Sequence, residues 1–183
     1  MLLARSGGND NVFGLVSGLL GVGGIVGGLY VSCFKLPKSS IKMIYVSAVF
    51  SFMAGDLLMG VGQNVVLWCI AGLAASVPIP FINAGQNIII YNHISKEMQG
   101  RIFAARNTMQ YATITIGILL GGFLADYVFE PFMLTDKSLA VLLQKIVGTG
   151  AGSGMAVMFL CTGILGGTTS ILWYGNSEIR KLK

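Results

Sequence analysis

The feature that most constrains this chain is a set of long stretches that contain no charged residue. They lie between Asp10 and Lys35, between Asp56 and Lys96, between Arg106 and Asp126, and between Lys145 and Glu178. A helix of about 20 residues crosses about 30 Å of hydrocarbon, and each stretch reaches or exceeds that length. The form must be a helix, because lipid offers no partner for backbone N–H and C=O groups. The stretches therefore predict transmembrane helices.

The composition excludes a soluble domain. Of the 183 residues, 54% are apolar and only 10% are charged, and the mean hydropathy is +0.77. A soluble domain usually carries about a quarter charged residues. The alternating polarity of a membrane β-barrel is absent. We therefore expect an all-α membrane protein with about five transmembrane helices.

We expect one transmembrane bundle over residues 1–183. The predicted helices cover residues 12–34, 43–60, 65–92, 105–126 and 154–175, followed by a cytoplasmic tail over 176–183. The third helix is long and contains Pro78 and Pro80, which predict a kink or a tilt. The longest connection covers 127–153, where the amphipathic stretch 138–147 predicts a short helix at the membrane surface.

The distribution of basic residues predicts the orientation. The loops over 35–42 and 93–106, together with the tail, hold nine of the twelve Lys and Arg residues. Such segments face the cytoplasm under the positive-inside rule. We therefore expect a multi-pass protein of the cell (inner) membrane, with the N-terminus of this chain outside and its C-terminus in the cytoplasm. The net charge of +5 is then a topology signal, and we expect no nucleic-acid partner.

Small residues at helical spacing predict where helices pack closely. Small residues let membrane helices approach, because lipid supplies no hydrophobic drive for their association. The stripes are tight contacts within one bundle or sliding surfaces in a conformational cycle, and the sequence leaves both open. Their members are Gly14, Gly18, Gly21, Gly28 and Ser32 in the first helix, Gly117, Gly121 and Ala125 in the fourth, and Gly163, Gly167 and Ser170 in the fifth.

Amide side chains are the main polar groups of the third and fourth helices. Asn83, Gln86 and Asn87 lie three and four residues apart, hence on one helical face. Amides donate and accept hydrogen bonds, so they suit a wet cavity that recognises polar atoms, or they bond to neighbouring helices. On the fourth helix Gln110 is the better candidate, because a threonine such as Thr113 often bonds to its own helix.

Asp56 is the one carboxylate inside a predicted crossing, since Asp126 is the last residue of the fourth. It reaches the outer interface, binds a coupling proton, or makes a buried structural bond, and these alternatives stay open. We expect neither an enzyme nor a cofactor or metal site. Ser153 in the GSG segment and His93 are predicted on opposite sides of the membrane, and no metal-ligand spacing or phosphate-binding loop occurs.

The segment over residues 99–133 resembles the drug-efflux branch of the major facilitator superfamily, the macrolide-efflux-like permeases. Members have a G-R-V-F-A loop, then G-x-L-A-D and F-E-P; here these are residues 100–104, 122–126 and 129–131. The beginning of the chain is similar to the loop after helix seven and the start of helix eight. The glycine-rich C-terminal segment is similar to the last helix and tail of such permeases.

The resemblance implies that the five helices are helices eight to twelve of a twelve-helix permease, with helices one to seven missing or supplied by another chain. It implies alternating access around a site between two halves. It places Asn83, Gln86 and Asn87 on a cavity-lining helix and Asp56 on a peripheral one, which weakens Asp56 as a coupling residue. Gly100, Arg101 and Arg106 then belong to the cytoplasmic loop, where the arginines anchor the protein or bond to helix ends when that side closes.

We expect the C-terminal part of a secondary active transporter that exports amphipathic, drug-like or macrolide-like small molecules by alternating access, coupled to protons. Its partners are the lipid bilayer, the missing N-terminal helices and the substrate. Two alternatives remain: a complete small membrane protein with a structural or assembly role, and an importer of the same superfamily. Sequence does not decide direction, because one fold serves both.

Overall fold

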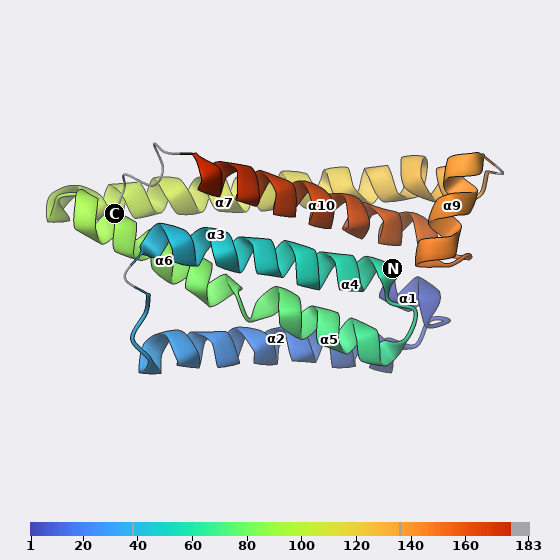
Figure 1. The fold of residues 1–183 in the computed structure, drawn as a ribbon, viewed down its shortest axis with the longest axis horizontal. Coiled ribbons are helices and arrows are strands. Elements are labelled where there is room, and N and C mark those ends of the chain that lie inside the picture. Colours follow the sequence, from blue (N-terminus) through green and yellow to red (C-terminus); the bar gives the residue numbers. More distant parts are fainter. Residues whose placement is uncertain (38, 136, 177–183) are drawn as a thin grey trace.

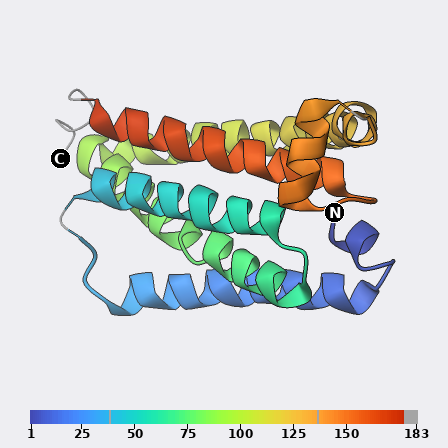
Figure 2. The same ribbon diagram turned by 45° about the vertical axis from the view of Figure 1, so that its right-hand side comes forward.

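The computed structural model describes residues 1–37, 39–135 and 137–176, and these residues are all-helical apart from short connections. Five helical segments are long and apolar enough to cross a membrane, as predicted. In Figures 1 and 2, α2 lies along one face of the bundle and α7 with α10 along the opposite face, with the second and third spans between them. The predicted tail, from 177 onward, lies outside the described residues.

The first span is α2 (Asp10–Cys33), which follows the single turn α1 (Leu2–Arg5). The side chain of Asn9 caps α2 by accepting a hydrogen bond from the Asn11 N–H at 3.0 Å. The helix contacts the third span through Gly23 and Gly27, both buried. A Cβ on either glycine would collide with Ser76 or with the Val77 backbone.

The stripe predicted for the first helix is not packed against another helix of the described bundle. Gly14, Gly18, Gly21 and Gly28 have open space where a Cβ would stand. Spacing alone identified several possible small-residue faces on this glycine-rich helix. The packed face is the one that contains Gly23 and Gly27, because the rotation of α2 about its axis directs these two glycines toward the third span.

The second span consists of α3 (Ser40–Phe50), the π-helical segment η1 (Ser51–Asp56) and α4 (Leu57–Val61). The wider η1 turns coincide with close contacts on two sides. Ser51 Oγ donates to the Ala75 carbonyl at 2.8 Å, and Gly55 is buried against Ala75. Short π-helical segments in α-helices often mark functional positions.

The third span is broken in its middle. α5 (Val65–Ser76) is capped by Asn64, whose side chain accepts from the Leu67 N–H at 2.9 Å, and α6 (Ile79–His93) begins directly after Pro78. Proline lacks the N–H of a helical hydrogen bond and clashes with the preceding turn. The predicted kink is thus a break at Val77–Pro78, visible in Figure 1 between α5 and α6.

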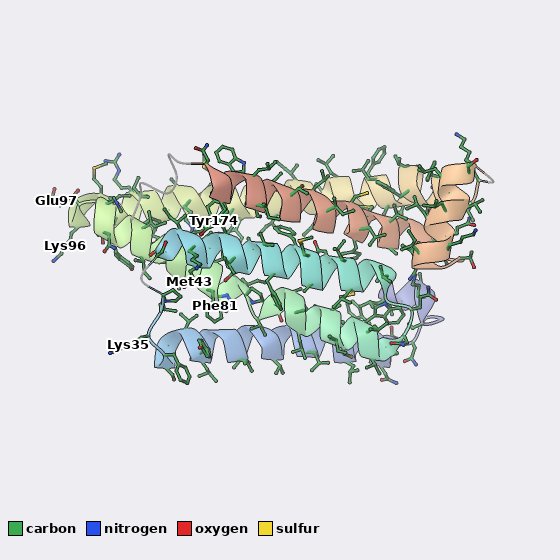
Figure 3. The ribbon with its side chains drawn as sticks, viewed as in Figure 1. Lys35, Met43, Phe81, Lys96, Glu97 and Tyr174 are labelled. Atoms are coloured by element: carbon green, nitrogen blue, oxygen red, sulfur yellow. The ribbon has the colours of Figure 1, made fainter. Side chains whose placement is uncertain are left out.

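The fourth span differs from the predicted one at both ends. α7 (Lys96–Leu124) begins nine residues before 105 and continues through the π-helical segment η2 (Ala125–Phe129) into α8 (Glu130–Met133). Most of the predicted loop over 93–106 is therefore helix. Its charged and polar residues, which suggested a loop, form an exposed first part of α7. In Figure 3, Lys96 and Glu97 lie at the tip where α6 turns into α7.

The chain ends with α9 (Ser138–Val147) and α10 (Ser153–Gly175). In Figures 1 and 2, α9 runs across one end of the bundle, transverse to the long helices. The fifth-helix stripe is packed as predicted: Gly163 and Gly167 are buried against η1 and its neighbour Leu57, where a Cβ would meet Leu57, Phe52 or Met53. The described residues thus form an all-helical bundle whose large apolar side chains mostly face outward. Such a surface is compatible with a surrounding lipid bilayer.

Candidate functional site

Arg106 is the centre of a polar cluster that joins α6 to α7. Its Nη1 donates to Asn87 Oδ1 at 2.7 Å and its Nη2 donates to Asn83 Oδ1 at 3.3 Å. The two asparagines stand four residues apart on α6, so they share the face that α7 follows. α6 ends at His93 and α7 begins at Lys96, so two residues connect the helices of this hairpin. Asn83 and Arg106 are equally far from that connection and therefore come to lie opposite each other.

The cluster holds a positive charge with neutral partners. Arg106 is half-buried, and both its acceptors are amide oxygens. Burying a cation costs free energy unless it is paired or hydrogen-bonded. The hydrogen bonds to the two amide oxygens reduce this cost for Arg106. The two amides therefore hold the guanidinium in place without neutralising it.

The cluster lies toward the end of the bundle where α3 starts. Gly85, between the two asparagines, packs against Ser40 and Ile44. In Figure 3, Lys35 and Lys96 lie at this same end. The predicted grouping of the loop after the first helix with the α6–α7 turn therefore agrees with the positions of these two lysines.

The other predicted pathway residues are not drawn into the cluster. Gln86 is half-buried on α6, and Gln110 is exposed on α7. Thr113 Oγ1 donates to the Met109 carbonyl of its own helix at 2.8 Å. The gate candidates Gly100 and Arg101 are exposed in the first part of α7. Of the named candidates, the structure brings Asn83, Asn87 and Arg106 together and leaves the others separate.

Asp56 forms a second, separate polar position. It is the last residue of η1 and is half-buried. Thr162 of α10 lies beside it, and the Thr162 hydroxyl donates to the Phe159 carbonyl of its own helix at 3.0 Å. The carboxylate lines a cavity of about 430 Å³ that Ser17 and Phe159 also line. Ile44 of the second span contacts Gly85, which lies between the two asparagines that bind Arg106. Asp56 is twelve residues beyond Ile44 in the same span, which is about 18 Å of helix. Asp56 and Arg106 therefore cannot act in direct contact.

The role of Glu130 is one that the sequence did not predict. Its two carboxylate oxygens accept from the N–H groups of Gly152 and Gly154, at 2.6 and 2.9 Å. The negative charge sits at the N-terminus of α10, where free N–H groups and the helix dipole favour it. The glycine-rich segment before α10 was a usable signal, because glycine amides can approach an acceptor closely.

No protein-family model matches the chain, and no curated protein or solved structure matches it either. The structure itself supports an all-helical protein with five long apolar helices, as expected of a multi-pass membrane protein that associates with a lipid bilayer.

Proposed function

We propose that this chain is part of a secondary active transporter that exports amphipathic small molecules by alternating access, coupled to protons. The observation that carries the proposal is the surface of α7. Its apolar part is hardly buried, yet Gln110 and Tyr111 are exposed on it. Lipid offers such groups no partner. They fit a helix that faces a wet pathway or another protein segment.

The resemblance of residues 99–133 to macrolide-efflux-like permeases supports the same proposal. In that proposal the bundle is the second half of a major facilitator fold, and helices one to seven belong to the same or another chain. Alternating access requires two halves that move around one site. The exposed surface of α7 is where the proposal places the substrate pathway.

The polar residues then have separate roles. Gln86, Gln110 and Thr113 line the pathway, where amides recognise polar atoms of a largely apolar molecule. Arg106, held by Asn83 and Asn87, keeps α6 and α7 together near the cytoplasmic end and acts as part of the gate. Gly100 and Arg101 precede it on the exposed first part of α7.

Asp56 is the proposed coupling residue. A carboxylate in a membrane span is costly and is a functional candidate by default. Its position on a cavity wall, at the end of a π-helical segment and beside Thr162, supports this role over a simple reach to the interface.

The test is drug accumulation in cells that lack the full-length gene. We expect such cells to accumulate a fluorescent amphipathic drug, restored full-length protein to lower that accumulation, and a proton uncoupler to abolish the difference. Asp56→Asn should remove the restored export, whereas Asp10→Asn, an exposed aspartate at the start of α2, should leave it intact. Lower accumulation in the deletion strain would indicate an importer, and no change would favour a structural or assembly protein.

The chain alone provides a second arm of this test. In liposomes with an imposed pH gradient, the 183-residue chain should give no drug flux above that of empty lipid, because one bundle does not enclose a site between two halves. Saturable, gradient-driven flux by this chain alone would contradict the proposal that further helices are required.

The proposed orientation has its own prediction. Single cysteines at Gly8 and Lys137 should react from outside intact cells with a membrane-impermeant thiol reagent, in a protein whose Cys33, Cys69 and Cys161 are replaced by alanine. A cysteine at Gln99 should react only after the membrane is permeabilised. Labelling of position 99 from outside would reverse the topology. The predicted cytoplasmic positions Lys38 and Lys183 lie outside the described residues.

A further inference from the structure

A polar cavity lies at the α9 end of the bundle, away from the residues of the proposed transport function. It has a volume of about 540 Å³. It is formed by α1, the turn between α4 and α5, and the end of α9 with the loop that follows, elements that Figures 1 and 2 place at one end of the molecule. Its lining includes Arg5, Gln63, Gln144, Lys145 and Thr149.

The lining is cationic. Arg5 and Lys145 are its charged residues, and the other polar groups are amides and a hydroxyl. Arg5 donates to the Gly62 carbonyl at 3.2 Å and to the Val147 carbonyl at 2.6 Å, which are two bonds of the five that a guanidinium can make. Burial lowers the pKa of Arg5 from its ordinary value, and the charge of Glu130 only partly offsets this effect. Both Glu130 oxygens already accept hydrogen bonds at the start of α10.

The surface of α9 next to this cavity is apolar. Ala140, Leu143 and Val147 face the bundle, whereas Leu139, Leu142 and Ile146 are exposed at spacings of three and four residues. A transverse helix with an exposed apolar face lies in the plane of a membrane interface. Lys145 borders that face on the helix. An occupant of the cavity can therefore continue directly into the acyl region beside α9.

We propose that this cavity binds the phosphate of an anionic phospholipid, with Arg5 and Lys145 at the headgroup and Leu139, Leu142 and Ile146 along the acyl chains. The phosphodiester of an anionic lipid supplies the net negative charge that the cavity lining lacks, whereas a choline headgroup cancels that charge with its own cation. The exposed apolar face of α9 favours a lipid over a small soluble anion. A lipid has acyl chains that can contact this face, and a small anion has none.

The test compares lipids of the same acyl chains in a neutral detergent, where no charged bilayer surface contributes. Phosphatidylglycerol should be retained by the purified chain in native mass spectrometry and should raise its melting temperature, whereas phosphatidylcholine should do neither. Lys145→Gln should weaken phosphatidylglycerol binding about fivefold, the value of one basic residue at an anionic headgroup.

Lys137 is the matched control, since it is an exposed lysine at the other end of α9 that does not line the cavity. Lys137→Gln should leave phosphatidylglycerol binding unchanged. Equal binding of the two lipids, or equal losses in the two lysine variants, would overturn the proposal. Competition by about 10 mM inorganic phosphate would overturn the choice of a lipid, because a headgroup anchored by acyl chains should outcompete a free anion at that concentration. Arg5→Gln should weaken phosphatidylglycerol binding more than Lys145→Gln does. If the Arg5→Gln variant does not fold, the Lys145→Gln variant still provides the test.

Discussion

α7 and α10 are both long and apolar, yet they are packed in opposite ways. α10 buries small residues along its length, among them Gly154, Gly163 and Gly167, against η1, α4 and η2. In α7, a Cβ added at Gly117 would meet open space, and no residue of the helix is buried. In Figure 1 the two helices lie along the same face of the bundle.

The difference shows that apolar character does not decide packing in this bundle. What separates the two helices is whether small residues meet a neighbour at close range, and whether polar side chains find partners inside the bundle. α10 satisfies both conditions. α7 is attached about a third of the way along by Arg106 and at its C-terminal end by η2, and presents unpacked polar groups between these two points. α10 is thus a structural helix, and α7 is the helix on which the proposed pathway depends.

The largest expected effect is at Gly154. A Cβ there would stand on the backbone of Phe129 and Glu130, and backbone cannot move aside as a side chain can. Gly154→Val should therefore lower the free energy of unfolding in detergent by about 3 kcal/mol or more. Gly117→Val on α7 should change it by less than about 0.5 kcal/mol. Equal losses in the two variants would mean that α7 is packed after all.

The next effect is at Glu130, which joins η2 and α8 to the start of α10. Glu130→Gln keeps the shape but removes the charge from two hydrogen bonds, so it should cost about 2 kcal/mol of unfolding free energy. Glu97→Gln is the control, because Glu97 is an exposed acid in the first turn of α7 and should cost about 0.5 kcal/mol. Denaturant titration of both variants measures the difference, and a loss at Glu97 as large as that at Glu130 would contradict the capping role.

A smaller effect is expected where α7 is attached to α6. Arg106→Gln removes the hydrogen bonds to Asn83 and Asn87 and should lower the free energy of unfolding by about 1.5 kcal/mol. Spin labels on α6 and α7 should report a wider distance distribution in this variant. Arg101→Gln, an exposed arginine of the same helix, should leave stability and distances unchanged. An Arg106 variant with unaltered distances would show that the cluster does not hold the hairpin together.

The smallest effect on stability is expected at Gln110, in the exposed middle of α7. Gln110→Leu should change the free energy of unfolding by less than about 0.5 kcal/mol, since leucine is well tolerated in membrane helices. In the full-length transporter it should weaken substrate binding by roughly 5- to 30-fold, the value of about 1–2 kcal/mol for one lost hydrogen bond.

Met109→Leu, at the neighbouring exposed position, is the control for Gln110 and should leave both quantities unchanged. Gln86→Leu should behave like Gln110→Leu. Asn87→Leu should instead lower stability, because its amide oxygen accepts from Arg106. If Gln110→Leu lowers the melting temperature and leaves substrate affinity intact, Gln110 is a packing residue and not part of the pathway.

The sequence by itself determined that the chain forms five long apolar helices, that the third is distorted near Pro78 and that a short helix covers 138–147. These features are local. Transfer into lipid is a property of each residue and of segment length, and a proline interrupts a helix wherever it stands. The start of α7 was missed because charged residues are as compatible with an exposed helix as with a loop.

Only the tertiary structure decided which faces and partners those helices use. Gly23 and Gly27 are packed in α2 instead of the predicted stripe, Asn83 and Asn87 turn to Arg106, and Glu130 caps α10. Each of these depends on the rotation of one helix relative to another. That rotation follows from contacts between residues far apart in the chain, and no local sequence pattern contains those contacts. In lipid an apolar helix gains little free energy by directing one apolar face inward instead of another, so hydrophobicity does not set the rotation either.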